Sequence, residues 1–265
     1  GSSVAAASTP VVRLRDQALS QELQDAWWRE GGFTEEQGAK VAEMRRRIEE
    51  EGLLTPWWDN RPCMQRFLAA KQWDVDKAVA MFRAHLAWRK EWHLDEESFV
   101  DTPHGRIPRL LAEFVLPEFP TIKDAYNYVH HGNDKSGRLI YVDRMGGVKL
   151  PQLRAACSEE RLIMTYVWEC EATACFRMPA STLAAGKLVD KTLSIVDLKG
   201  FSIPMFDARM RKYLSIVIKL SQDNYPEMLG KMYVINVCRA ALGSYTPILC
   251  TLRARRSFDP YCVPC

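Results

Sequence analysis

The sequence predicts an α/β fold, in which a helical N-terminal region is followed by a mostly parallel sheet flanked by helices. Residues 34–93 carry apolar side chains at helical spacing, together with residue types that begin and end helices. After residue 138, apolar β-branched runs alternate with longer amphipathic segments, which is the pattern of parallel strands joined by helical crossovers. The chain has 265 residues, of which 47% are hydrophobic and 26% charged, and this composition excludes a disordered or collagen-like polymer.

Three helices are predicted in residues 34–93. The first begins at Thr34, because Thr34 and Gln37 have the spacing of a capping box, and Gly52 supplies its end. Its apolar face holds Val41, Met44 and Ile48. The second helix contains Met64, Phe67 and Leu68. The third begins at Asp74, a residue type that caps helix N-termini. Its apolar stripe holds Val75, Val79, Phe82 and Leu86.

A proline-containing connector separates this helical region from the predicted sheet. Four prolines between residues 103 and 120 exclude a long helix there and leave a short one near Arg109 to Phe114. Helices are then expected from Ser158 to about Asp190, with an interruption at Pro179, and from Met205 to Ser221. Strands are expected at Leu139–Met145, Thr192–Leu198 and Met232–Val237.

This order of elements divides the chain into four parts. They are a leader (1–32), a helical region (33–95), a domain that contains the sheet (96–236) and a basic tail (237–265). From Val237 onward four arginines face one acidic residue, so the tail carries the whole net charge of +3. A net charge of this size does not indicate nucleic acid binding.

Targeting and cysteine patterns favour a cytoplasmic protein. No apolar run reaches the roughly 18 residues that a membrane-spanning helix needs. The N-terminal residues lack a basic segment followed by an apolar one, so no secretory signal is predicted. Eight cysteines are scattered along the chain without a dense disulfide framework, and reduced thiols in the cytosol are expected.

The sequence lacks the motifs that mark common enzymes. There is no G-x-S-x-G, G-x-x-x-x-G-K-[ST], G-x-G-x-x-G or H-E-x-x-H motif. Adjacent His130 and His131 point to opposite faces of a strand, so they do not chelate one ion together, and packing or hydrogen bonding is favoured over a metal or haem ligand. The tail holds a single C-x-x-C pair, where a zinc knuckle needs two. We therefore expect no enzyme activity, no metal and no cofactor.

Two hydroxyl side chains lie together in the predicted strand 192–198. Strand alternation puts Thr192 and Ser194 on the same face, in a strand otherwise made mainly of apolar residues. Either each hydroxyl bonds a neighbouring backbone carbonyl, or both recognise a ligand.

Six segments carry a resemblance to a known family. They include Asn224-Tyr225-Pro226-Glu227-Met228-Leu229-Gly230-Lys231 and Ser194-Ile195-Val196-Asp197-Leu198-Lys199-Gly200. The other four lie at residues 67–75, 88–90, 134–138 and 167–186. In this order and spacing the segments resemble the CRAL-TRIO lipid-binding domain, and within it the phosphatidylinositol/phosphatidylcholine transfer proteins of the secretory pathway. The resemblance runs from about Leu54 to Asn236, and it implies a sheet and helices that enclose a lipid cavity.

The resemblance also implies a set of lipid-binding residues. Lys71 stands where the family has an arginine that contacts the phosphoinositide headgroup, and Glu227 is the glutamate of its Tyr-Pro-Glu motif. Thr192 and Ser194 match a hydroxyl pair that contacts the phosphatidylcholine headgroup. Tyr141 matches one of two tyrosines of that same site, and His130 replaces the other. Each residue also has a structural alternative, such as capping a turn or filling the core.

The C-terminal end departs from the family pattern. Where the family continues with a gate helix and a further strand, this chain reads Val237-Cys238-Arg239-Ala240-Ala241-Leu242 and ends at Cys265. An atypical, truncated C-terminus is therefore expected, from either an altered reading frame or divergence. A missing gate would expose an apolar groove and weaken lipid retention.

The function that the resemblance implies is exchange of phosphatidylinositol and phosphatidylcholine between membranes, or their presentation to lipid enzymes. A monomer in the cytoplasm, bound peripherally and transiently to the Golgi or to other cytosolic membrane faces, is expected. Two alternatives remain. One is a carrier of another apolar ligand, such as a sterol, tocopherol, retinoid or haem. The other is an interaction module that cannot transfer lipid because its gate is incomplete.

Overall fold

The structure of this protein is a computed structural model that describes residues 34–54, 58–94, 99–102, 105–108 and 118–237. Two compact units are formed. The first contains the described parts of residues 1–116, 168–188 and 222–227, and the second those of 117–167, 189–221 and 228–265. The leader (1–32), the short helix predicted near Arg109 to Phe114 and all of the tail after Val237 lie outside the described residues.

Three predicted helices of the first unit are confirmed with their caps. Helix α3 (Glu35–Glu50) begins with the capping box, since the Gln37 N–H donates to Thr34 Oγ1 and the Thr34 N–H to Gln37 Oε1, both at 3.2 Å. Asn60 caps α4 (Arg61–Ala70) and Asp74 caps α5 (Val75–Glu91), each through a side-chain oxygen that accepts from a backbone N–H of the first turn. The predicted starts at Thr34 and Asp74 are therefore correct, whereas the cap at Asn60 was not predicted.

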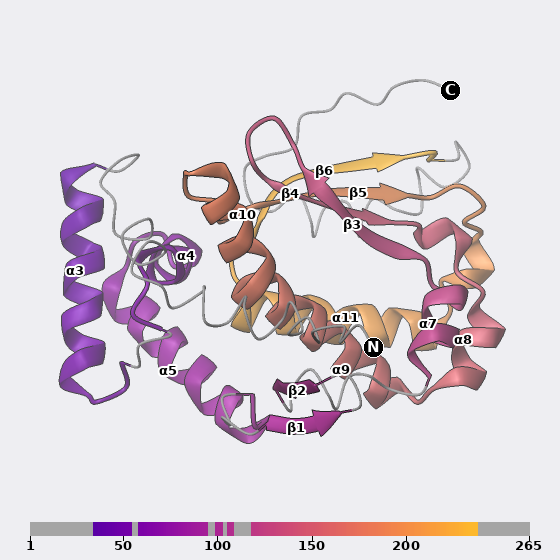
Figure 1. The fold of residues 1–265 in the computed structure, drawn as a ribbon, viewed down its shortest axis with the longest axis horizontal. Helices are drawn as coiled ribbons and strands as arrows, with labels where there is room; N and C mark the ends of the chain where they lie inside the picture. Colours follow the sequence, from indigo (N-terminus) through magenta and orange to yellow (C-terminus); the bar gives the residue numbers. More distant parts are fainter. Residues whose placement is uncertain (1–33, 55–57, 95–98, 103–104, 109–117, 238–265) are drawn as a thin grey trace, which may run out of the picture. The chain divides into compact units, whose positions relative to one another are not determined.

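The core of the first unit lies among these three helices (Figure 1). The rings of Phe67 and Phe82 meet edge to face, with centroids 5.2 Å apart. Val75 and Leu86 of the predicted stripe pack only partly buried against this core. The fully buried apolar residues include Val41, Met44, Ile48, Met64, Phe67, Leu68, Val79 and Phe82.

The long helical region after Ser158 is divided differently from the prediction. Helix α9 (Glu159–Ala172) is followed by one wide π turn at Thr173–Arg177 and then by α10 (Met178–Ala185). The interruption thus precedes Pro179, which sits in the first turn of α10, where a missing N–H costs nothing. The helix ends at Ala185 rather than near Asp190, because Gly186 adopts φ +60°, a left-handed conformation that stops helices.

The second unit contains a four-stranded sheet in the order β3-β4-β5-β6. The strands span Tyr128–Asn133, Leu139–Asp143, Thr192–Asp197 and Leu229–Ile235. The strand β3 is antiparallel to β4, whereas β4, β5 and β6 are parallel, so the predicted mostly parallel sheet is confirmed. A separate antiparallel pair, β1 (Phe99–Thr102) and β2 (Gly105–Pro108), was not predicted.

Helices cover one face of the four-stranded sheet. Figure 1 shows α7 (Phe119–Ala125), α8 (Leu150–Ala156) and α11 (Ala208–Asn224) on the same side of the strands. Helix α11 begins three residues later than predicted, because Asp207 caps it by accepting from the Met210 N–H at 2.9 Å. Short 3-10 turns occur at Met145–Gly147 and Ile203–Met205.

One glycine allows the turn after β4 to approach the end of β5. A Cβ placed on Gly146 would lie 2.3 Å from the backbone oxygen of Lys199, so no larger residue fits without moving the chain. The short 3-10 turn at Met145–Gly147 therefore requires glycine at position 146.

Within the described part of the chain, no helix combines the length and apolar character needed to cross a membrane. The four cysteines of this part, Cys63, Cys157, Cys170 and Cys175, form no disulfide.

Candidate functional site

Three of the predicted site residues form a row across the sheet of the second unit. His130 on β3 pairs with Tyr141 on β4, and Tyr141 pairs with Ser194 on β5. Directly paired residues point to the same face of a sheet. The His130 and Tyr141 rings are 5.1 Å apart between centroids and inclined by 48°. The structure therefore places an imidazole, a phenol and a hydroxyl side by side on one face of the sheet.

The two hydroxyls of β5 have different surroundings. Thr192 lies on the same face as Ser194, but its hydroxyl donates to the Met228 carbonyl at 3.3 Å. No described residue forms a hydrogen bond with the Ser194 hydroxyl, and both side chains are only half-buried. Of the two alternatives, backbone bonding therefore accounts for Thr192, while Ser194 keeps a hydroxyl to offer to a ligand.

Lys71 and Glu227 belong to the first unit. Lys71 ends α4 and is half-buried, and its backbone N–H donates to carbonyls of the last helical turn. Glu227 follows Tyr225-Pro226 and holds φ +56°, which is uncommon for a residue with a side chain. Glu227 is half-buried, and the surrounding structure must hold its backbone in this left-handed conformation. Its assigned role in lipid binding stays a prediction.

Aromatic side chains continue from the row toward the helices. The Tyr141 ring lies 6.0 Å from that of Tyr128, and the Tyr128 ring lies 5.2 Å from that of Tyr126, at the end of α7. These separations are within the range of favourable ring contacts. A continuous aromatic surface thus joins His130 to Tyr126.

A buried carboxyl group lies beside this surface. Asp143 pairs with Tyr128 across the sheet, and its Oδ2 accepts from the Tyr126 hydroxyl at 2.8 Å. The residue is 8% exposed, and its Oδ1 has no hydrogen-bond partner among the described residues. Burial raises the pKa of Asp143 to about 6, and the hydrogen bond from Tyr126 opposes that rise in part. The site therefore contains an acid that changes its charge near neutral pH.

We expect Asp143→Asn to stabilise the fold at pH 7.5 by about 1–3 kcal/mol. The folded protein binds the Asp143 proton more tightly than the unfolded chain, whose Asp pKa is about 3.9. At pH 7.5 the buried carboxylate is charged and opposes folding. As the pH falls from above 6 toward 4, Asp143 takes up a proton in the fold and this destabilisation is lost. Urea unfolding of both proteins at pH 4, 5, 6 and 7.5 measures the difference, which should shrink toward pH 4. Parallel stability curves for the two proteins would show that Asp143 is not protonated more readily in the fold.

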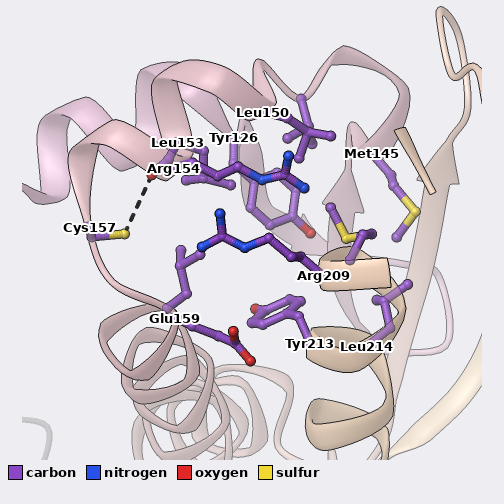
Figure 2. A pocket seen from close by; sticks show the side chains of 13 residues that line it. Tyr126, Met145, Leu150, Leu153, Arg154, Cys157, Glu159, Arg209, Tyr213 and Leu214 are labelled. Carbon is purple, nitrogen blue, oxygen red and sulfur yellow. Dashed lines mark hydrogen bonds between the residues drawn. The ribbon is translucent and has the colours of Figure 1, made fainter. Parts of the chain in front are cut away.

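A cavity of about 80 Å³ lies between the helices of the second unit, and Tyr126 lines it (Figure 2). Its apolar walls include Met145, Val148, Leu150, Leu153, Leu162 and Leu214. An apolar cavity of about 150 Å³ holds benzene, so this one accommodates roughly three or four carbons of a chain. Binding a diacyl lipid therefore has to enlarge this cavity or extend beyond it.

The resemblance implied a cavity, but sequence reasoning missed Asp143, Tyr126 and Tyr128 and did not name the residues that line the cavity. Strand alternation indicated two of these residues, because residues two apart in a strand share a face. Asp143 lies two residues after Tyr141, and Tyr128 lies two residues before His130. The contact of Tyr126 with the sheet depends on how α7 packs, which no local pattern shows. Among the described residues no cluster of three or more His, Cys, Asp or Glu side chains is placed to hold a metal ion.

Comparison with protein families decides the relationship of the chain. Residues 40–84 match the CRAL/TRIO N-terminal domain and residues 123–254 match the CRAL/TRIO domain, which together are more than half of the chain. The chain belongs to the CRAL/TRIO family. The CRAL/TRIO match continues past Asn236, where the resemblance by motifs ended.

Relatives of this CRAL/TRIO chain include lipid transfer proteins. It is 33% identical over 206 residues to the SEC14 cytosolic factor of Eremothecium gossypii, covering 78% of this chain and 62% of that protein. It is 31% identical over 196 residues to the phosphatidylinositol/phosphatidylcholine transfer protein SFH4 of Arabidopsis thaliana, covering 74% and 30%. The chain thus spans less than two-thirds of the length of these relatives.

A solved structure confirms the CRAL/TRIO fold. The crystal structure of Sfh5 superimposes with a TM-score of 0.51 at 14% identity, covering 83% of this chain and 77% of that one. The predicted helical region followed by a sheet flanked by helices is therefore correct for the described residues.

Proposed function

We propose that this protein binds phosphatidylcholine and phosphatidylinositol and exchanges them between membranes, or presents them to lipid enzymes. The observation that carries the proposal is the row of His130, Tyr141 and Ser194 on one face of the sheet, from which ring contacts lead to Tyr126 at the end of α7. Its donors and rings suit a phosphate and a choline group, since hydroxyls and imidazoles bond phosphate oxygens and aromatic faces attract quaternary ammonium. Relatives named as transfer proteins for these two lipids support the assignment.

The energy of the acyl chains explains why such a carrier needs an apolar interior. A diacyl phospholipid has on the order of 30 methylenes, each worth about 0.8 kcal/mol when kept from water. The apolar cavity bounded by Tyr126 gives one chain end a dry environment at the far end of the aromatic surface. Headgroup contacts then select the lipid, while the chains supply the affinity.

The proposal assigns no bond-making step to the protein. Transfer exchanges one bound lipid for another, so neither a nucleophile nor a cofactor is required. We place the protein, as a monomer, at cytosolic membrane faces such as that of the Golgi, in transient contact with the bilayer. The name of the SEC14 cytosolic factors supports the cytosolic side.

A crossed experiment on the two headgroup sites tests this function. We expect the double variant Thr192→Ala with Ser194→Ala to lose at least fivefold in phosphatidylcholine transfer, because a charge-assisted hydrogen bond to phosphate contributes about 1.5–3 kcal/mol. Its phosphatidylinositol transfer should change less. Glu227→Ala should show the reverse order.

Vesicle assays with each of the two lipids, on the wild type and both variants, give the six rates needed. Equal losses of both lipids in the hydroxyl variant would remove Thr192 and Ser194 from the headgroup site. Unchanged phosphatidylinositol pickup by Glu227→Ala would remove Glu227. A wild-type protein that moves neither lipid would reject the proposed function and favour another apolar cargo, for which His130 in place of a tyrosine is the first residue to examine.

A further inference from the structure

Of the charged side chains that line the cavity of the second unit, one forms no ion pair with any residue that the structure describes. Arg154, Glu159 and Arg209 line it. Arg154 forms an ion pair with Asp207 at 2.7 Å, and Glu159 one with Lys212 at 3.0 Å. Arg209 has no ion pair or side-chain hydrogen bond with any described residue. The Arg209 guanidinium is therefore a positive charge at the edge of the apolar cavity that no described carboxylate pairs with.

The position of Arg209 directs that charge at the cavity. The residue is exposed on the first turn of α11, and in Figure 2 its side chain extends across the opening between Tyr213 and Arg154. The start of a helix carries partial positive charge from its backbone N–H groups, so a cation there is unfavourable by itself. A bound anion would interact favourably with both the guanidinium and the helix end.

We propose that this cavity binds a single-chain anionic amphiphile, with the end of its aliphatic tail among the apolar walls and its anionic oxygens on Arg209. The tail is held by burial of about three or four carbons, and the head by charge-assisted hydrogen bonds. A fatty-acid carboxylate and a single-chain phosphate share this chemistry. The site exists whether or not the protein transfers phospholipids, and a ligand bound here competes with a phospholipid chain end for the same space.

Cys157 gives a direct readout of occupancy. It lines the cavity, is half-buried, and its Sγ lies 3.8 Å from the Leu153 oxygen. Burial raises the pKa of this thiol, so alkylation is slow enough to follow at pH 8. A ligand in the cavity should protect Cys157 from N-ethylmaleimide. Peptide mass spectrometry measures this site separately, with Cys170 of the first unit as an internal reference.

The experiment compares octanoate, octyl phosphate, octanol and inorganic phosphate on the full chain, below the concentrations at which micelles form. Octanoate or octyl phosphate should protect Cys157 at concentrations at least tenfold lower than octanol. The tighter of the two identifies the carboxylate or the phosphate as the preferred head. Inorganic phosphate should not protect, because it lacks the tail.

Two variants separate the site from nonspecific effects. Arg209→Gln should weaken protection by octanoate and octyl phosphate at least tenfold and leave octanol unchanged. Arg211→Gln removes the same charge two residues away, where the side chain donates to the Phe206 carbonyl and does not line the cavity, so protection should persist. Absence of protection in the wild type, equal protection by octanol, or full protection in Arg209→Gln would overturn the proposal. Because each comparison uses the same protein with and without ligand, a changed intrinsic thiol reactivity does not affect the result.

Discussion

Replacing Arg89 by Met should lower the free energy of unfolding by about 3–5 kcal/mol, because it leaves a buried carboxylate without its cation. The Arg89 guanidinium donates from Nη1 and Nη2 to the two carboxylate oxygens of Glu171, at 2.7 and 2.9 Å. Both side chains are 2% exposed. The Tyr225 hydroxyl donates to the same carboxylate at 2.6 Å, and the guanidinium lies 4.3 Å from the Trp58 ring centroid.

The electrostatics of Glu171 explain the size of this effect. Burial alone raises the pKa of Glu171, but the charge and hydrogen bonds of Arg89, with the hydrogen bond from Tyr225, outweigh it and hold the pKa below its ordinary value. Without Arg89 the carboxyl group stays in an apolar core and must take up a proton or unfold the first unit.

Chemical denaturation of wild type and variants measures this prediction. Arg46→Met is the matched control, since Arg46 pairs with Glu43 and Glu50 at the surface and should cost no more than about 1 kcal/mol. Replacing both Arg89 and Glu171 by Met should recover part of the loss, because no unpaired charge remains. A loss in Arg89→Met as small as in the surface control would show that the buried pair does not hold the first unit together.

Filling the cavity of the second unit should block lipid uptake. Leu214 lines this cavity on α11, and the larger side chain of a Trp in its place would occupy most of the roughly 80 Å³ space. Overpacking costs about 1–3 kcal/mol of stability, which a folded domain tolerates, but the space for the chain end is lost. We expect the fraction of lipid-loaded Leu214→Trp to fall at least tenfold.

The neighbouring residue provides the control for this change. Ser215 is exposed on the same helix and does not line the cavity, so Ser215→Trp adds the same side chain without filling it. Lipid extraction and quantification on equal amounts of the folded variants measure the loaded fraction. Equal loading of the two variants would show that acyl chains do not enter this cavity.

Local signals predicted the helices of the first unit well. The starts at Thr34 and Asp74 depend on side-chain caps within three residues, and such short-range chemistry is visible in a sequence. The start of α11 was misplaced because the apolar pattern already begins at Met205. The cap at Asp207, which accepts from the Met210 N–H three residues later, is a local signal of the same kind and was overlooked.

The candidate site was predicted in part. The shared face of Thr192 and Ser194 follows from strand alternation, and the family resemblance added Tyr141 and His130, which the register then placed beside Ser194. Lys71 and Glu227 lie apart from this row, and the lipid-binding roles of all six residues remain predictions. The Arg89–Glu171 pair joins residues 82 positions apart, and the lining of the cavity comes from five segments. The resemblance implied a cavity, but no local pattern identifies its lining residues or this ion pair.

Native mass spectrometry of the full chain, purified from eukaryotic cells without detergent, measures whether the protein carries one of these phospholipids. The protein should carry one lipid per chain, which fragmentation identifies as phosphatidylcholine or phosphatidylinositol, and Leu214→Trp from the same cells should be largely empty. Wild-type protein that is folded and carries no lipid, or that carries a porphyrin or sterol in its place, would contradict the assignment as a carrier of these phospholipids.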